Sequence, residues 1–183
     1  MRTRRGALAF LGGLGSALAL AGCETDPNAP YLGGIGDPVR GAALRAPRNF
    51  GEPDRWVGNP ANAALAVEQQ EFLTSELPAS PIYAPVLNPA VVQTLQQGRA
   101  EMRDYLGIPA SADPQAVIEA MRRAGTTLRA GNQAGAEAAL TGPAFPAGPK
   151  AVLARLSAMP RMPQTVAAAG MVASDFDRLD RIR

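Results

Sequence analysis

The chain has 183 residues, with 18 basic and 16 acidic side chains, one cysteine and no histidine. These absences exclude Ser-His-Asp and Cys-His catalytic sites, Cys/His zinc sites and a disulfide within the chain. Without Arg2, Arg4 and Arg5 the chain keeps 15 basic and 16 acidic residues, and this near-neutral charge argues against binding to nucleic acid.

The first 22 residues have the pattern of an export signal. After the basic start, the seventeen residues from Gly6 to Gly22 carry no charge and end in small side chains. Gly12, Gly13 and Gly15 interrupt this stretch, which is shorter than the roughly 20 apolar residues that span a bilayer. We therefore expect residues 1–22 to be a signal peptide. The pair Arg4-Arg5 also fits twin-arginine export, so the Sec and twin-arginine routes both stay open.

The segment Leu20-Ala21-Gly22-Cys23 resembles the lipobox of bacterial lipoproteins. This resemblance covers only the leader. It implies cleavage between Gly22 and Cys23, a diacylglycerol on the Cys23 sulfur and usually a further acyl chain on the new amine. Two or three acyl chains anchor a protein stably, because each buried methylene contributes about 0.8 kcal/mol. The alternative is an ordinary signal peptide, with Cys23 next to the cleavage site by chance.

Residues 23–55 are rich in proline and glycine and lack a period of 2 or 3.6 that buries one face. We expect a lipid-anchored tether here, either extended or disordered. Phe50 and Trp56 are expected to pack at the edge of the domain that follows. A chain that starts near residue 49 is accordingly expected to keep its helical fold.

Residues 56–183 predict one all-α domain, a small irregular bundle of about five to six helices. Asn59-Pro60 and Asn88-Pro89 each place an N-cap residue before a proline at the first helical position. Gly107 is well placed to end the second of these helices. The expected helices lie within residues 59–77, 88–107, 111–132, 133–140, 149–159 and 163–183. No segment has the alternation typical of a strand.

Two acidic pairs, Glu68 with Glu71 and Glu101 with Asp104, are candidates for catalysis. A spacing of three places each pair on one helical face, and two such carboxylates can act as acid and base on a glycosidic bond. Peptidoglycan would be the natural substrate in the cell envelope. Because glutamine and arginine side chains flank both pairs, we expect solvated helix surface instead. Neutralising all four acids is expected to leave the fold unchanged.

Three aspartates near the C-terminus and Lys150 complete the candidates. The aspartates lack the glycine turn and terminal glutamate of a calcium loop, and their spacing predicts helical ion pairs. The expected pairs are Asp175–Arg178, Asp177–Arg181 and Asp180–Arg183. Lys150 lies at a helix start without a Ser-x-x-Lys motif, so we expect a surface lysine. The sequence thus predicts no catalytic residue, no cofactor and no metal site.

These observations predict a membrane-anchored bacterial envelope lipoprotein with a non-catalytic helical binding or structural module. The expected partners are the lipid bilayer, through acylated Cys23, and an envelope protein, but not nucleic acid. The domain would face the periplasm from the cell membrane or from the outer membrane. The alternatives are a peptidoglycan-active enzyme that uses one of the acidic pairs, and an accessory subunit of an envelope protein complex.

Overall fold

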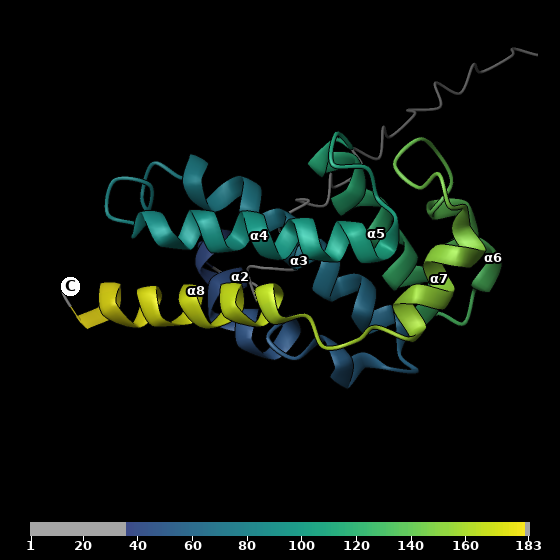
Figure 1. Cartoon of the computed structure of the whole chain (residues 1–183), viewed down its shortest axis with the longest axis horizontal. Helices are drawn as coiled ribbons and strands as arrows, with labels where there is room; N and C mark the ends of the chain where they lie inside the picture. The colour runs from purple at the N-terminus through teal and green to yellow at the C-terminus, as the bar shows by residue number, and fades with distance from the viewer. Residues whose placement is uncertain (1–35, 182–183) are drawn as a thin grey trace, which may run out of the picture.

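The computed structural model of the chain describes residues 36–181, and Figure 1 shows their arrangement. Within this range there are seven α-helices, one short 3-10 helix and no strand, which confirms the all-α class. The elements are α2 (Pro38–Asn49), η1 (Pro53–Trp56), α3 (Pro60–Ala79), α4 (Pro89–Leu106), α5 (Pro114–Arg129), α6 (Gln133–Ala139), α7 (Pro149–Ser157) and α8 (Pro163–Arg181). None of the described helices is both long and apolar enough to cross a membrane.

Six of these helices lie where the sequence predicts them, because local chemistry sets their ends. The side chains of Asn59 and Asn88 accept hydrogen bonds from backbone amides in the first turns of α3 and α4. Gly107 ends α4 in the left-handed conformation, with φ of 72°, where a residue with a Cβ is strained. The N-cap and proline signals therefore suffice to predict these boundaries from the local sequence.

The seventh helix, α2, corrects the predicted organisation of the chain. It lies inside the segment 23–55 that we expected to be a tether, and it is part of the folded body. Phe50, at its C-terminal end, is fully buried rather than at the domain edge, whereas Trp56 is half-buried. The folded body therefore begins before residue 56, near Pro38. Residues 23–35 lie outside the described residues.

Helix α2 forms because Asp37 caps it and Pro38 occupies its first turn. The Asp37 side chain accepts hydrogen bonds from the amides of Val39 and Arg40, at 2.9 and 3.2 Å. Its buried face is made almost entirely of small side chains, namely Val39, Ala42, Ala43 and Ala46. Such a face has no pattern of large apolar residues, so the periodicity of the sequence gives no sign of it. The helix packs on α3 and α8.

Helix α3 is the centre of the bundle. It contacts α2, α4, α5 and α7, and every residue from 66 to 74 is buried. In Figure 1, α4 and α8 extend side by side toward the C-terminal end, while α5, α6 and α7 gather at the opposite end. Because neighbours surround α3, the polar residues in its middle must find partners inside the protein.

Candidate functional site

The middle of α3 carries four consecutive polar residues, 68–71, which we call the polar turn. Each of the four, Glu68, Gln69, Gln70 and Glu71, is at most 3 % exposed. The expectation that Glu68 and Glu71 lie on solvated surface is therefore wrong. A helix rotates about 100° per residue, so these four side chains point toward different neighbours rather than toward one face.

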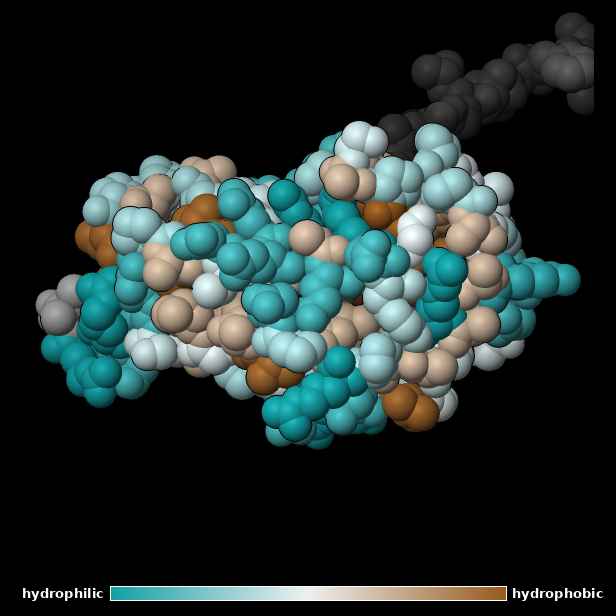
Figure 2. Space-filling view, viewed as in Figure 1, coloured by the Kyte–Doolittle hydropathy of each residue, from teal (hydrophilic) through white to brown (hydrophobic). Residues whose placement is uncertain are grey.

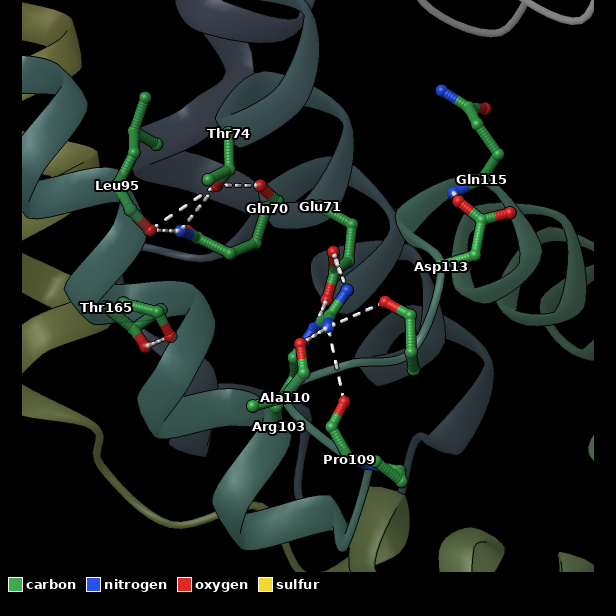
Figure 3. A network of polar contacts seen from close by, with 12 residues as sticks. Gln70, Glu71, Thr74, Leu95, Arg103, Pro109, Ala110, Asp113, Gln115 and Thr165 are labelled. Carbon is green, nitrogen blue, oxygen red and sulfur yellow. Dashed lines mark hydrogen bonds and ion pairs between the residues drawn. The ribbon is translucent and has the colours of Figure 1, made fainter. Parts of the chain in front are cut away.

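Glu71 forms a bidentate ion pair with Arg103 of α4. The Arg103 Nε and Nη2 atoms donate to the two carboxylate oxygens at 2.6 and 2.8 Å. Figure 3 shows Arg103 between Glu71 on one side and backbone carbonyls of the loop after α4 on the other. Its Nη1 donates to the carbonyls of Pro109, Ala110 and Ala112, at 3.0 to 3.3 Å. This arginine thus joins α3, α4 and that loop.

Glu68 pairs with a different arginine on a different helix. The Arg122 Nε of α5 donates to the Glu68 carboxylate at 2.6 Å. The first acidic pair is consequently divided between two arginine partners, each of which occupies one carboxylate. The two ion pairs thus join α3 to α4 and to α5.

The two glutamines of the polar turn complete these connections. Gln69 accepts a hydrogen bond from the Asn49 amide and donates to the carbonyl of Ala42, at 2.6 Å, so it joins α3 to α2. Gln70 donates to the carbonyl of Leu95 in α4 at 2.9 Å. Its Oε1 atom is buried without a hydrogen-bond partner among the described residues. The polar turn therefore reaches α2, α4 and α5.

The second acidic pair is also divided. Glu101 accepts hydrogen bonds from both the backbone amide and the hydroxyl of Thr165, at 2.8 and 2.9 Å. Thr165 lies in the first turn of α8, where backbone amides lack helical partners and favour a carboxylate. Asp104 is exposed. Glu101 thus caps α8 from α4, and Asp104 remains on the surface as expected.

Two of the three predicted ion pairs near the C-terminus are present. Asp175–Arg178 and Asp177–Arg181 form at 2.7 and 2.9 Å. Asp180 pairs with Arg40 of α2, also at 2.7 Å, and the predicted pair Asp180–Arg183 involves Arg183, which lies outside the described residues. Lys150 is exposed. Across residues 36–181, no group of three acidic, cysteine or histidine side chains is placed to hold a metal ion.

A cleft between α2, η1 and α3 was not predicted from the sequence. Its volume is about 340 Å³, which is at the lower end for sites that hold small molecules. We call it the arginine cleft, and its lining residues are Arg45, Arg48, Asn49, Trp56, Asn62, Leu65 and Gln69. Arg45 and Arg48 are exposed and lie one turn apart on α2, whereas Gln69 is buried.

Hydrogen bonds among its own residues hold this cleft in shape. The Trp56 indole nitrogen donates to the carbonyl of Asn49 at 2.7 Å, and the Asn49 side chain donates to Gln69. The guanidinium carbon of Arg55 is 4.9 Å from the centre of the Trp56 ring, a distance typical of a cation–π contact. The Trp56 ring and the side-chain amides of Asn49 and Gln69 are therefore held in place by contacts within the protein.

The charge of the arginine cleft distinguishes it from two other hollows of the described surface. Among residues 36–181, no acidic side chain lines it, whereas Glu52 and Asp54 line a hollow of similar size beside Arg161. A wider groove of about 520 Å³ between α5 and α6 is mainly apolar. Two guanidinium groups beside an aromatic ring suit a carboxylate or phosphate attached to a larger molecule.

The sequence contains one sign of this cleft. Arg45 and Arg48 are three residues apart, so they share a face as soon as residues 38–49 are recognised as a helix. The sequence pattern does not reveal this helix, because its buried face consists of small residues.

Cys23, the predicted lipid attachment site, and Gly22 lie outside the described residues. Comparison of the chain with protein-family models, with curated proteins and with solved structures finds no match.

Proposed function

We propose that this protein is a bacterial envelope lipoprotein, anchored through Cys23, whose helical body is a non-catalytic binding module. We further propose that the arginine cleft holds an anionic group of its ligand. The observation that carries the second proposal is that Arg45 and Arg48 lie beside Trp56 in a cleft that none of the acidic residues within 36–181 lines. The lipobox resemblance of residues 20–23 carries the first.

The positions of the acidic residues support a binding role over the hydrolase alternative. Catalysis on a glycosidic bond needs two carboxylates on either side of the substrate. Glu68 and Glu71 lie inside the bundle, each in an ion pair with its own arginine. Glu101 caps α8, and no carboxylate of the described residues lines the arginine cleft.

Trp56 is the only tryptophan of the chain, so tryptophan fluorescence reports directly on the arginine cleft. The lipidated protein in detergent is titrated with soluble muropeptides, which are anionic fragments of peptidoglycan, and separately with inorganic phosphate. We expect a saturable change in Trp56 emission with muropeptides. The double variant Arg45→Gln/Arg48→Gln should bind at least about tenfold more weakly, since one hydrogen bond to a charged group contributes about 1.5–3 kcal/mol.

The matched control is Arg123→Gln/Arg129→Gln, which removes the same charge from the exposed surface of α5. This variant should bind like the wild type. Equal weakening of binding by both double variants would mean that the overall positive charge, rather than the cleft, attracts the ligand.

The anchor is tested separately with Cys23→Ser, which should abolish incorporation of labelled palmitate and leave an uncleaved precursor. Normal maturation and membrane retention of this variant would contradict the lipoprotein proposal.

A further inference from the structure

The loop between α3 and α4 displays an unusual run of exposed apolar residues. We call residues 81–86 the apolar loop, and its exposed members are Pro81, Ile82, Ala84, Pro85 and Val86. Ile82 is 56 % exposed and Val86 is 48 % exposed, and both belong to the small set of exposed large apolar side chains. The sequence carries no charge from Leu77 to Gly98. Figure 2 shows brown and tan atoms over this end of the molecule, above the teal end of α8.

The apolar loop is held firmly by α8. Tyr83 is buried beneath it, with its ring centre 5.0 Å from that of Phe176. Arg178 donates a hydrogen bond to the carbonyl of Val86 at 2.8 Å, and the amide of Asn88 donates to Asp175 at 3.2 Å. The exposure of Ile82 and Val86 is therefore a feature of the fold, since Tyr83 between them is buried and the backbone of Val86 and Asn88 is hydrogen-bonded to α8.

The first described helix enters the bundle beside this loop. Arg40 forms two hydrogen bonds with Asp180 of α8, at 2.7 and 2.8 Å, and Asp180 is two residues from Arg178. Gly36, the first described residue, precedes Arg40 by only four positions. Thirteen peptide units join Gly36 to Cys23, and they span at most about 45 Å when fully extended. The segment that carries Cys23 therefore joins the bundle at the same end as the apolar loop.

The arginine cleft lies toward the other end of α3. Its lining residues Asn62 and Leu65 are in the first half of α3, and the apolar loop follows Ala79. At 1.5 Å per residue, about 15 Å of helix separates Gln69, and about 25 Å separates Asn62, from the loop. A molecule that rests on its apolar loop would therefore raise the cleft above the bilayer.

Charge at this end is balanced, so the surface is suited to apolar rather than electrostatic contact. In the described part of the chain, three arginines at this end are each paired with an aspartate of α8: Arg40 with Asp180, Arg178 with Asp175, and Arg181 with Asp177. A surface of this kind gains little from anionic lipid headgroups. Tethering supplies the missing affinity, because a linked site has an effective concentration on the order of millimolar.

We propose that the apolar loop docks on the surface of the bilayer that holds Cys23, with Ile82 and Val86 inserted among the lipid headgroups. This orients the arginine cleft away from the membrane, toward ligands in the aqueous compartment. The inference rests on the proposed lipid anchor and goes beyond it, because a lipid on Cys23 alone does not fix which face of the bundle meets the bilayer.

The test uses the full lipidated chain in vesicles of phosphatidylethanolamine and phosphatidylglycerol. In lipidated protein, acylated Cys23 is unreactive and is the only native cysteine, so an introduced cysteine can be labelled alone. The variants are Ile82→Cys and Val86→Cys, with Ala134→Cys as the control. Ala134 is exposed on α6, at the opposite end of the bundle (Figure 1). Each carries an environment-sensitive fluorophore, and lipids with a nitroxide near the headgroup act as quenchers.

We expect labels at positions 82 and 86 to be blue-shifted and quenched several-fold more strongly than the label at position 134. This difference should persist at high salt, because charge does not carry the contact. Equal quenching at 82 and 134, in protein whose mass shows the acyl chains, overturns the docking proposal and leaves the anchor proposal intact. Loss of the difference at high salt overturns the apolar mode of contact. A mature protein without acyl chains overturns both proposals.

Discussion

The Arg103 guanidinium and the Glu71 carboxylate are joined by two hydrogen bonds, at 2.6 and 2.8 Å, where their side chains are only 5 % and 1 % exposed. Arg103 belongs to α4 and Glu71 to α3, so the pair fixes how these two helices meet. Buried ions that lose their partner are strongly destabilising, whereas a well-packed apolar pair of similar volume is often tolerated. We therefore expect the effects of substituting Glu71 and Arg103 on the free energy of unfolding to be non-additive.

Glu71→Leu should lower the free energy of unfolding by about 3–5 kcal/mol, because it leaves the Arg103 charge uncompensated inside the bundle. The double variant Glu71→Leu/Arg103→Met should be more stable than either single variant, as measured by urea unfolding. The control is the exposed pair Glu119–Arg123 of α5, whose removal should cost less than about 1 kcal/mol. Additive losses at Glu71 and Arg103 would contradict the coupling.

Glu101 and Asp104 offer a comparison between two acids of one helix. Glu101→Gln should destabilise the protein by about 0.5–2 kcal/mol, because it weakens the cap on the first turn of α8. Asp104→Asn should have no measurable effect, since Asp104 is exposed. Thermal unfolding of both variants, followed by circular dichroism, checks this prediction. Equal effects would mean that Glu101 does not stabilise α8.

Gly98 of α4 lies close to both α3 and α8. A Cβ at this position would lie 3.0 Å from the Gln70 side-chain nitrogen and 3.1 Å from the Thr165 Cα. Gly98→Ala should therefore cost about 1–3 kcal/mol through overpacking. Gly170, in α8, has open space around it, so Gly170→Ala should stabilise the helix by up to about 1 kcal/mol. Chemical unfolding of the two variants should give changes of opposite sign.

The packing of α2 predicts where the folded body begins. A chain that starts at Gly36 should unfold cooperatively, whereas one that starts at Gly51 should lose several kcal/mol or fail to fold. Burial of Phe50 alone contributes roughly 1.5–3 kcal/mol, and the contact of Arg40 with Asp180 is lost with it. Circular dichroism melting of the two chains checks this. Equal cooperativity would support the sequence-based expectation that a start near residue 49 suffices.

Tyr105 predicts a dependence of stability on alkaline pH. Burial raises the pKa of the Tyr105 hydroxyl above its ordinary value of 10.0, against a smaller opposing effect of Arg155. The hydroxyl donates to the carbonyl of Ala158 at 2.8 Å. The folded state holds this proton more tightly than the unfolded state. The stability that the protonated Tyr105 hydroxyl contributes is therefore fully present below pH 10 and is lost as the pH rises through the raised pKa.

Tyr105→Phe should therefore be less stable than the wild type near pH 8, by about 1 kcal/mol for the lost hydrogen bond. The gap should narrow as the pH rises above 10, since only the wild type has this ionisation to lose. Urea unfolding between pH 8 and 11 measures the gap, and the other tyrosines cancel because both proteins contain them. A gap independent of pH would mean that Tyr105 keeps an ordinary pKa.

The sequence by itself determined the helical class and six of the seven α-helices of the described chain. The reason is that a helix begins and ends through contacts within a few residues. Asn59 with Pro60 and Asn88 with Pro89 start helices locally, and Gly107 stops one through its own backbone conformation. Asp37 with Pro38 starts α2 through the same chemistry. This helix was not predicted, because its buried face of small side chains gives no apolar periodicity.

Only the tertiary structure decided that the polar turn is buried and where the arginine cleft lies. Spacing in the sequence placed Glu68 and Glu71 on one face and predicted exposure, yet their partners Arg122 and Arg103 are 54 and 32 residues away. Whether a polar residue is buried depends on such distant partners, which cancel the cost of removing its charge from water. A helix surrounded on every side, like α3, gives no sign of this in its own sequence.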